Sequence, residues 1–84
     1  MDNKYLVELF VPTLDKIYNV YLPVNRRVGN VISLLNKSLN EITNGEYVGN
    51  EHTCLYDRET GQKLEPNQLI RETTVKNGSG ILML

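Results

Sequence analysis

Two side chains near the middle of the chain could do chemistry, and they are two positions apart: His52 and Cys54. A thiol beside an imidazole can act as a nucleophile with its base. That chemistry also needs a third group to orient the base, and two residues on one strand do not supply it. The sequence holds one histidine and one cysteine, too few for a zinc site or a four-cysteine iron–sulphur cluster. We therefore predict no enzyme, no metal and no cofactor.

The composition excludes several classes of partner. A net charge of −1 does not suit a protein that binds nucleic acid or an anionic membrane. No run approaches the ~20 apolar residues of a membrane span, and the opening "MDNKYLVELFVP" lacks the features of a signal peptide. The glycines of "NGSG" precede an apolar run, whereas a phosphate-binding loop precedes a helix. We expect a cytoplasmic protein that binds another protein, with no nucleic acid and no membrane insertion.

Alternation of apolar residues predicts an opening hairpin, with one strand over 4–11 and a second over 17–22. The period then changes to that of a helix. Its apolar stripe comprises Val28, Val31, Ile32, Leu35, Leu39 and Ile42. Asn25 is the predicted N-cap, and Asn44-Gly45 the predicted stop. Arg26 and Arg27 then fall in the first turn, where the macrodipole disfavours positive charge. They either contact an acidic partner or are solvated charges without a role.

The second half of the chain contains shorter elements. Residues 53–64 predict a second hairpin with Gly61 at its turn. "PNQLI" predicts one helical turn with Pro66 at its start, Val75 a core plug, and "ILML" a central strand beside the first one and parallel to it. The fold class is α+β, with one main helix on one face of a mixed sheet of four to five strands.

This pattern resembles ubiquitin and the β-grasp fold over nearly the whole chain. The landmarks are the opening hairpin, the helix led by "VGNVISLL", the segment "LYDRETGQKLEPNQLI" and the closing "VKNGSGILML". The stretch "YNVYLPVNRRVGNVISLLNKSLNEI" is similar to the YukD/EsaB family, small ubiquitin-like components of Gram-positive type VII (ESX/WXG100) secretion. The resemblance implies a single ubiquitin-like domain over residues 1–84. It also implies a non-enzymatic adaptor or regulator that binds the cytosolic part of a secretion ATPase or membrane component.

Ubiquitin and the sulphur carriers of the same fold act through a flexible C-terminal Gly-Gly. Here Gly78 and Gly80 come before the closing strand, and the printed chain stops at Leu84. We therefore expect no conjugation. The alternatives are a sulphur carrier or protein modifier of the ubiquitin-like class, a structural homodimer, and a domain split off from a larger membrane protein.

One face of the predicted sheet carries the candidate binding site. If the inward residues of the first and last strands face the helix, alternation turns Leu6, Phe10, Leu82 and Leu84 outward. A strand over 53–57 with Cys54 and Tyr56 inward adds a fifth residue, Leu55. The predicted protein-binding residues are Leu6, Phe10, Leu55, Leu82 and Leu84, because an exposed apolar patch usually marks an interaction site. The predicted charged rim is Glu8, Arg58 and Glu59. Homodimerisation through this face, cover by the loop "NGEYVGNEH", and a register error of one residue remain alternatives.

Overall fold

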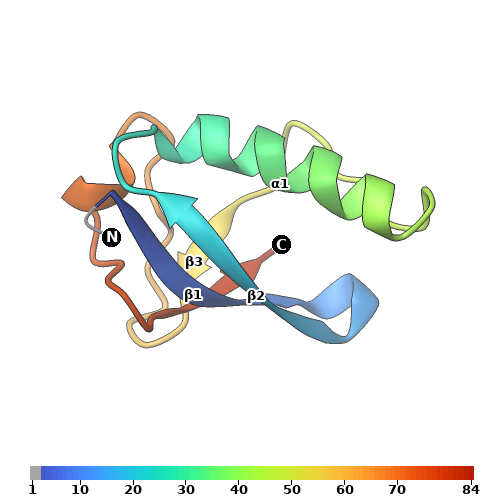
Figure 1. The fold of residues 1–84 in the computed structure, drawn as a ribbon, viewed down its shortest axis with the longest axis horizontal. Helices are drawn as coiled ribbons and strands as arrows, with labels where there is room; N and C mark the ends of the chain where they lie inside the picture. Colours follow the sequence, from blue (N-terminus) through green and yellow to red (C-terminus); the bar gives the residue numbers. More distant parts are fainter. Residues whose placement is uncertain (1–2) are drawn as a thin grey trace.

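A long hairpin begins the fold in the computed structural model, which describes residues 3–84 (Figure 1). Strands β1 (Lys4–Val11) and β2 (Lys16–Pro23) pair antiparallel, from Lys4 opposite Pro23 to Val11 opposite Lys16. The short 3-10 helix η1 (Pro12–Leu14) joins them, and Asp15 completes the turn with a φ of 53°. The alternation read from the sequence is confirmed, because the alternate residues Val7, Leu9 and Val11 are buried.

The closing strand lies in the middle of the sheet. β4 (Gly80–Met83) runs parallel to β1, and β3 (Leu55–Asp57) pairs antiparallel with its other side, giving the strand order β2-β1-β4-β3. The α+β prediction and the central position of the last strand are both confirmed.

The helix α1 (Val28–Ile42) covers one face of the sheet, as Figure 1 shows. Its stripe buries Val28, Val31, Ile32 and Leu39 and half-buries Leu35. Ile42 is 63% exposed, so its predicted place in the stripe is wrong. The last turn runs past the edge of the core, and the helix stops through Asn44 and Gly45, which have positive φ.

The N-terminus of α1 differs from the prediction. The N-cap is Arg27, in an extended conformation, rather than Asn25. Arg26 and Arg27 therefore precede the first turn, and they contact residues 67–70. Ile70 donates its N–H to the Arg26 carbonyl, and the Arg27 guanidinium donates to the Asn67 carbonyl. Arg27 thus has a structural contact within the chain.

The segment after β3 is less regular than predicted. The predicted second strand of the second hairpin does not form; a single bridge pairs Tyr56 with Lys63. The sheet therefore has four strands in the described chain. The helical turn forms at η2 (Ile70–Glu72), later than "PNQLI", because Ile70 is fully buried and the Glu72 carboxylate accepts the Leu69 N–H at 2.8 Å. Val75 is 2% exposed, as expected for a plug.

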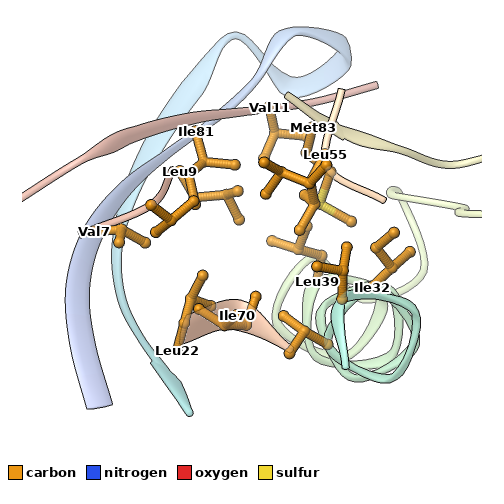
Figure 2. Packing of buried hydrophobic residues seen from close by; sticks show 14 of the residues in the cluster. Val7, Leu9, Val11, Leu22, Ile32, Leu39, Leu55, Ile70, Ile81 and Met83 are labelled. Atoms are coloured by element: carbon orange, nitrogen blue, oxygen red, sulfur yellow. The ribbon is translucent and has the colours of Figure 1, made fainter. Parts of the chain in front are cut away.

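The core lies between α1 and the inner face of the sheet (Figure 2). Leu9, Ile81 and Met83 point into it from the two central strands, and Ile32 and Leu39 meet them from the helix. All five are at most 9% exposed. This packing assigns the opposite sheet face, here called the outer face, to the remaining residues of each strand.

Candidate protein-binding face

A row of apolar side chains crosses the outer face over all four strands. The register pairs Ile17 with Phe10, Phe10 with Leu82, and Leu82 with Tyr56. Neighbouring strands lie about 4.8 Å apart, so these four residues, here called the apolar row, span roughly 14 Å. Phe10, Leu82 and Tyr56 are half-exposed and Ile17 is 55% exposed. Large apolar groups are therefore held in a line on a rigid surface.

Leu84 extends this surface along β4. It lies two residues beyond Leu82 and is 54% exposed. Its backbone exchanges two hydrogen bonds with Cys54, with N···O distances of 3.0 and 2.6 Å. Leu84 is therefore fixed beside the apolar row, where the sequence analysis expected it.

Leu6 faces outward but lies apart from the apolar row. It pairs with Tyr21, and both side chains are exposed. Between this pair and the apolar row runs a polar line, formed by Asn19, Glu8 and Gly80 in register. The five residues predicted to form one patch are therefore not all brought together.

The prediction that Leu55 faces outward in the binding patch is wrong. Leu55 is 0% exposed, pairs with Met83 on the inner face, and belongs to the core. Tyr56 faces outward in its place, opposite Leu82. The inward and outward residues of β3 are therefore the reverse of those predicted. Leu55 and Asp57 are both buried on the inner side.

Each carboxylate oxygen of buried Asp57 accepts a hydrogen bond. Its Oδ1 accepts the Glu59 N–H at 2.9 Å, and its Oδ2 accepts the Thr74 hydroxyl. The Thr74 bond lowers the pKa of Asp57 below its ordinary value most strongly. Burial opposes this shift, while the backbone N–H groups of Glu59 and Thr60 and the charge of Lys76 add to it. The carboxylate therefore ties the end of β3 to the loop before β4.

We expect Asp57 to make the protein acid-sensitive. Because its pKa is lower in the folded than in the unfolded state, its stabilisation is complete above the unfolded value, about 4, and is lost as the pH falls through the folded pKa. Urea unfolding of the wild type and Asp57→Asn over a pH series should show a difference of about 1–3 kcal/mol near neutrality. That difference should shrink as the pH falls below about 4.

Thr74→Val is the matched control for this titration. It removes the hydroxyl that lowers the Asp57 pKa most, so the folded pKa should move back toward the unfolded value. The pH-dependent loss of stability should then be smaller than in the wild type and should be complete at a higher pH. A wild-type-to-Asn difference that stays constant from neutral to acid pH would contradict the role given to the Asp57 charge.

Arg58 lies on the outer face rather than at its rim, where it was predicted. Its Cζ is 5.2 Å from the centroid of the Phe10 ring, a cation–π distance. Its aliphatic stem passes over Gly80, where a Cβ would lie 3.3 Å from the Arg58 Cδ. Gly80 therefore leaves the space through which this cation reaches the apolar row.

A hollow of about 570 Å³ opens beside Arg58. Its lining consists of Phe10, Tyr56, Asp57, Arg58, Gly61, Leu82 and Leu84. Such a depression, apolar with one cation at its side, suits a large apolar side chain from another protein.

The loop after α1 does not cover this surface. Tyr47 is 7% exposed within the core cluster, and its hydroxyl donates to the Asn36 side chain at 2.9 Å. The Asn40 side chain donates to the Tyr47 carbonyl at 2.9 Å. The loop is therefore held along α1, and its predicted alternative role as a cover for the outer face is wrong.

His52 and Cys54 are not arranged for nucleophilic chemistry. His52 lies in a turn before β3 instead of on a strand, and its side chain is 86% exposed, 3.7 Å from the Glu51 carboxylate. The Cys54 thiol donates to the His52 backbone carbonyl at 3.3 Å. Within residues 3–84, no three His, Cys, Asp or Glu side chains gather as they would to bind a metal.

Comparison with known proteins gives a match in structure. No family model and no curated protein matches the chain. A chain from a study of molecular mimicry of SUMO in DNA repair is 15% identical, with a TM-score of 0.72 over 100% of this chain and 94% of that chain. A protein designed on the basis of ubiquitin is 18% identical, with a TM-score of 0.69 over 100% and 90%. The chain has the ubiquitin-like β-grasp fold.

The ubiquitin-like fold also occurs in a larger match. A chain of the MycP5-free ESX-5 inner membrane complex (State II) is 19% identical, with a TM-score of 0.69 over 98% of this chain and 21% of that chain. In the chain described here, no helix of residues 3–84, α1 included, is long and apolar enough to span a bilayer.

Proposed function

We propose that this ubiquitin-like domain is a non-enzymatic adaptor or regulator that binds another protein through the outer face of its sheet. The apolar row carries this proposal, because it places exposed and half-exposed large side chains on a rigid sheet beside a hollow. Contiguous apolar surface of this kind is typical of interaction sites. Rigid strands lower the entropy lost when a partner binds.

The proposed mechanism is docking around Phe10 and Leu82. A large apolar side chain of the partner fills the hollow and displaces water from Leu82 and Tyr56. The Arg58 guanidinium, already held over the Phe10 ring, meets a carboxylate or carbonyl of the partner. The apolar contacts supply most of the affinity, and the charge sets the orientation.

The proposal extends to the cytoplasmic side of a Gram-positive type VII secretion system, with the cytosolic part of a secretion ATPase or membrane component as the partner. The resemblance read in residues 18–42 to the YukD/EsaB family suggests this setting. One finding supports it: a domain of the same fold forms about a fifth of a chain in an ESX-5 inner membrane complex. In this proposal the domain binds its partner non-covalently, through the outer face of its sheet.

Titration of the isotope-labelled protein with purified cytosolic segments of the secretion ATPase and of each membrane component tests this function. We expect NMR shift changes at Phe10, Tyr56, Leu82 and Leu84. Leu34, which is 48% exposed on α1, serves as the internal reference and should not shift. Binding that perturbs α1 and leaves the apolar row unchanged would overturn the proposed docking face, and no binding to any component would overturn the secretion role.

A further inference from the structure

Along the outer border of β2 lie backbone groups that no strand of residues 3–84 uses. In β1, Glu8 donates its N–H to Ser79, and Leu6 accepts from Gly78, so the even-numbered residues of β1 turn their backbone groups toward β4. The odd-numbered residues of β1 therefore bond to β2, where their register partners have even numbers. It follows that Ile17, Asn19 and Tyr21 direct their N–H and C=O groups away from the sheet.

The middle of this border lacks the features that protect edge strands. β2 is eight residues long, its pairing with β1 is continuous without a bulge, and its one charged residue, Lys16, and its proline, Pro23, stand at its two ends. The opposite border is different: β3 has three residues, and residues 62–64 cover it through hydrogen bonds to Asp57 and Leu55. Long, uncharged edges pair readily with another strand.

We propose that β2 of a second copy of this chain occupies this border, antiparallel, with the two-fold axis at Asn19. In this register the numbers of any two paired residues, one from each copy, add up to 38. Asn19 then meets Asn19 of the second copy, and Ile17 meets its Tyr21. All three outward-directed residues of each strand fall in hydrogen-bonded pairs, giving six backbone hydrogen bonds. If the paired numbers added up to 36, Tyr21 would lie opposite position 15, outside β2, and the ladder would be incomplete at its ends. If they added up to 40, Ile17 would lie opposite Pro23, which has no N–H to donate.

The side chains are complementary in the same register. On the outer face, Ile17 of each copy lies opposite the Tyr21 ring of the other copy. Such aliphatic–aromatic cross-strand pairs are favourable, and the two-fold symmetry gives two of them. On the inner face, half-buried Tyr18 meets half-buried Val20 of the second copy. Lys16 lies opposite Leu22 of the second copy, so no like charges are opposed. Self-pairing therefore covers Ile17 and Tyr21, which are 55% and 65% exposed in the monomer.

The dimer would join the two separated parts of the outer face. Because Tyr21 pairs with Leu6 within each chain, the apolar row of one copy continues through Ile17 into Tyr21 and then Leu6 of the second copy. The eight-stranded sheet turns both outer faces to the same side. Given the proposed function, two docking faces on one rigid body would bind a multisubunit partner with avidity.

Charge substitution at the two-fold axis tests this pairing, because Asn19 is exposed and, in the dimer, lies opposite Asn19 of the second copy. Within its own chain Asn19 lies opposite Glu8, so the lysine and aspartate variants are compared with each other as well as with the wild type. Sedimentation equilibrium of the wild type should show the mass rise from 9.6 kDa toward twice that value between about 10 μM and 1 mM, a range suited to a small interface. Asn19→Lys alone and Asn19→Asp alone should each weaken dimerisation about two- to fivefold, since like charges then face each other. An equimolar mixture of the two variants should dimerise again.

Other outcomes would overturn the proposal. A wild type that stays monomeric to about 1 mM excludes a second copy and leaves the edge to a different strand. A dimer that Asn19→Lys does not weaken, or a mixture that does not dimerise, excludes this register. A dimer weakened by Leu82→Asp and not by Asn19→Lys would place self-association on the outer face. Failure here leaves the NMR test of the proposed function unaffected, because that test measures binding of a different protein.

Discussion

Replacing Leu39 by alanine should lower the free energy of unfolding by about 2–5 kcal/mol. Leu39 is 3% exposed and points from α1 into the core beneath the sheet (Figure 2). Truncation removes buried methyl groups and leaves a cavity between helix and sheet, whose walls relax only in part. A domain of 84 residues has a total stability of roughly 4–13 kcal/mol. This one change would therefore remove a large share of it.

Urea unfolding followed by circular dichroism measures this loss. The matched control is Leu34→Ala, the same truncation on the same helix at a side chain that is 48% exposed. It should cost less than about 1 kcal/mol. Equal losses in the two variants would contradict the side of α1 assigned to the core.

The long elements of this fold could be predicted from the sequence because their periodicity is repeated. Eight residues of β1 alternate over four cycles, and the stripe of α1 recurs through Val28, Val31, Ile32 and Leu39. Ile42 continues the same spacing and is nevertheless exposed. Periodicity fixes the side of a helix, whereas the end of the core depends on where the sheet stops.

The short elements could not be predicted in the same way. β3 has three residues, and Cys54, Leu55 and Tyr56 are all apolar enough to face inward, so alternation alone does not choose between them. The deciding residue is Asp57, which a sequence reading turns toward solvent. It faces inward because Thr74, 17 residues later, supplies a hydrogen bond to its carboxylate. Long-range satisfaction of a buried carboxylate has no local pattern.

The candidate site shows the same division. Phe10, Leu82 and Leu84 face outward as predicted, because each lies on a strand whose direction the sequence indicates. Tyr56 was missed with the register of β3. Ile17 was missed although alternation with Tyr18 places it outward. The position of Arg58 over Phe10 depends on the missing side chain of Gly80 on a neighbouring strand, which only the assembled sheet shows.

Leu82→Asp should weaken binding to the proposed partner at least about 30-fold, the effect expected at the centre of an interface. Leu82 stands between Phe10 and Tyr56 in the apolar row and lines the hollow. A carboxylate at this position would have to lose water on docking, and it would attract the Arg58 guanidinium away from the partner. Isothermal titration with the cytosolic segment that binds the wild type measures the change.

The fold should withstand this substitution, because the Leu82 side chain is half-exposed and its backbone pairing does not depend on side-chain type. Leu34→Asp is the control: it adds the same charge at an exposed leucine on α1, so binding should stay within about twofold of the wild type. Unchanged binding by Leu82→Asp would move the docking surface off the apolar row. A loss of stability comparable to that of Leu39→Ala would instead show that Leu82 is a core residue. Retained stability with lost binding is the one combination that assigns the outer face to a partner.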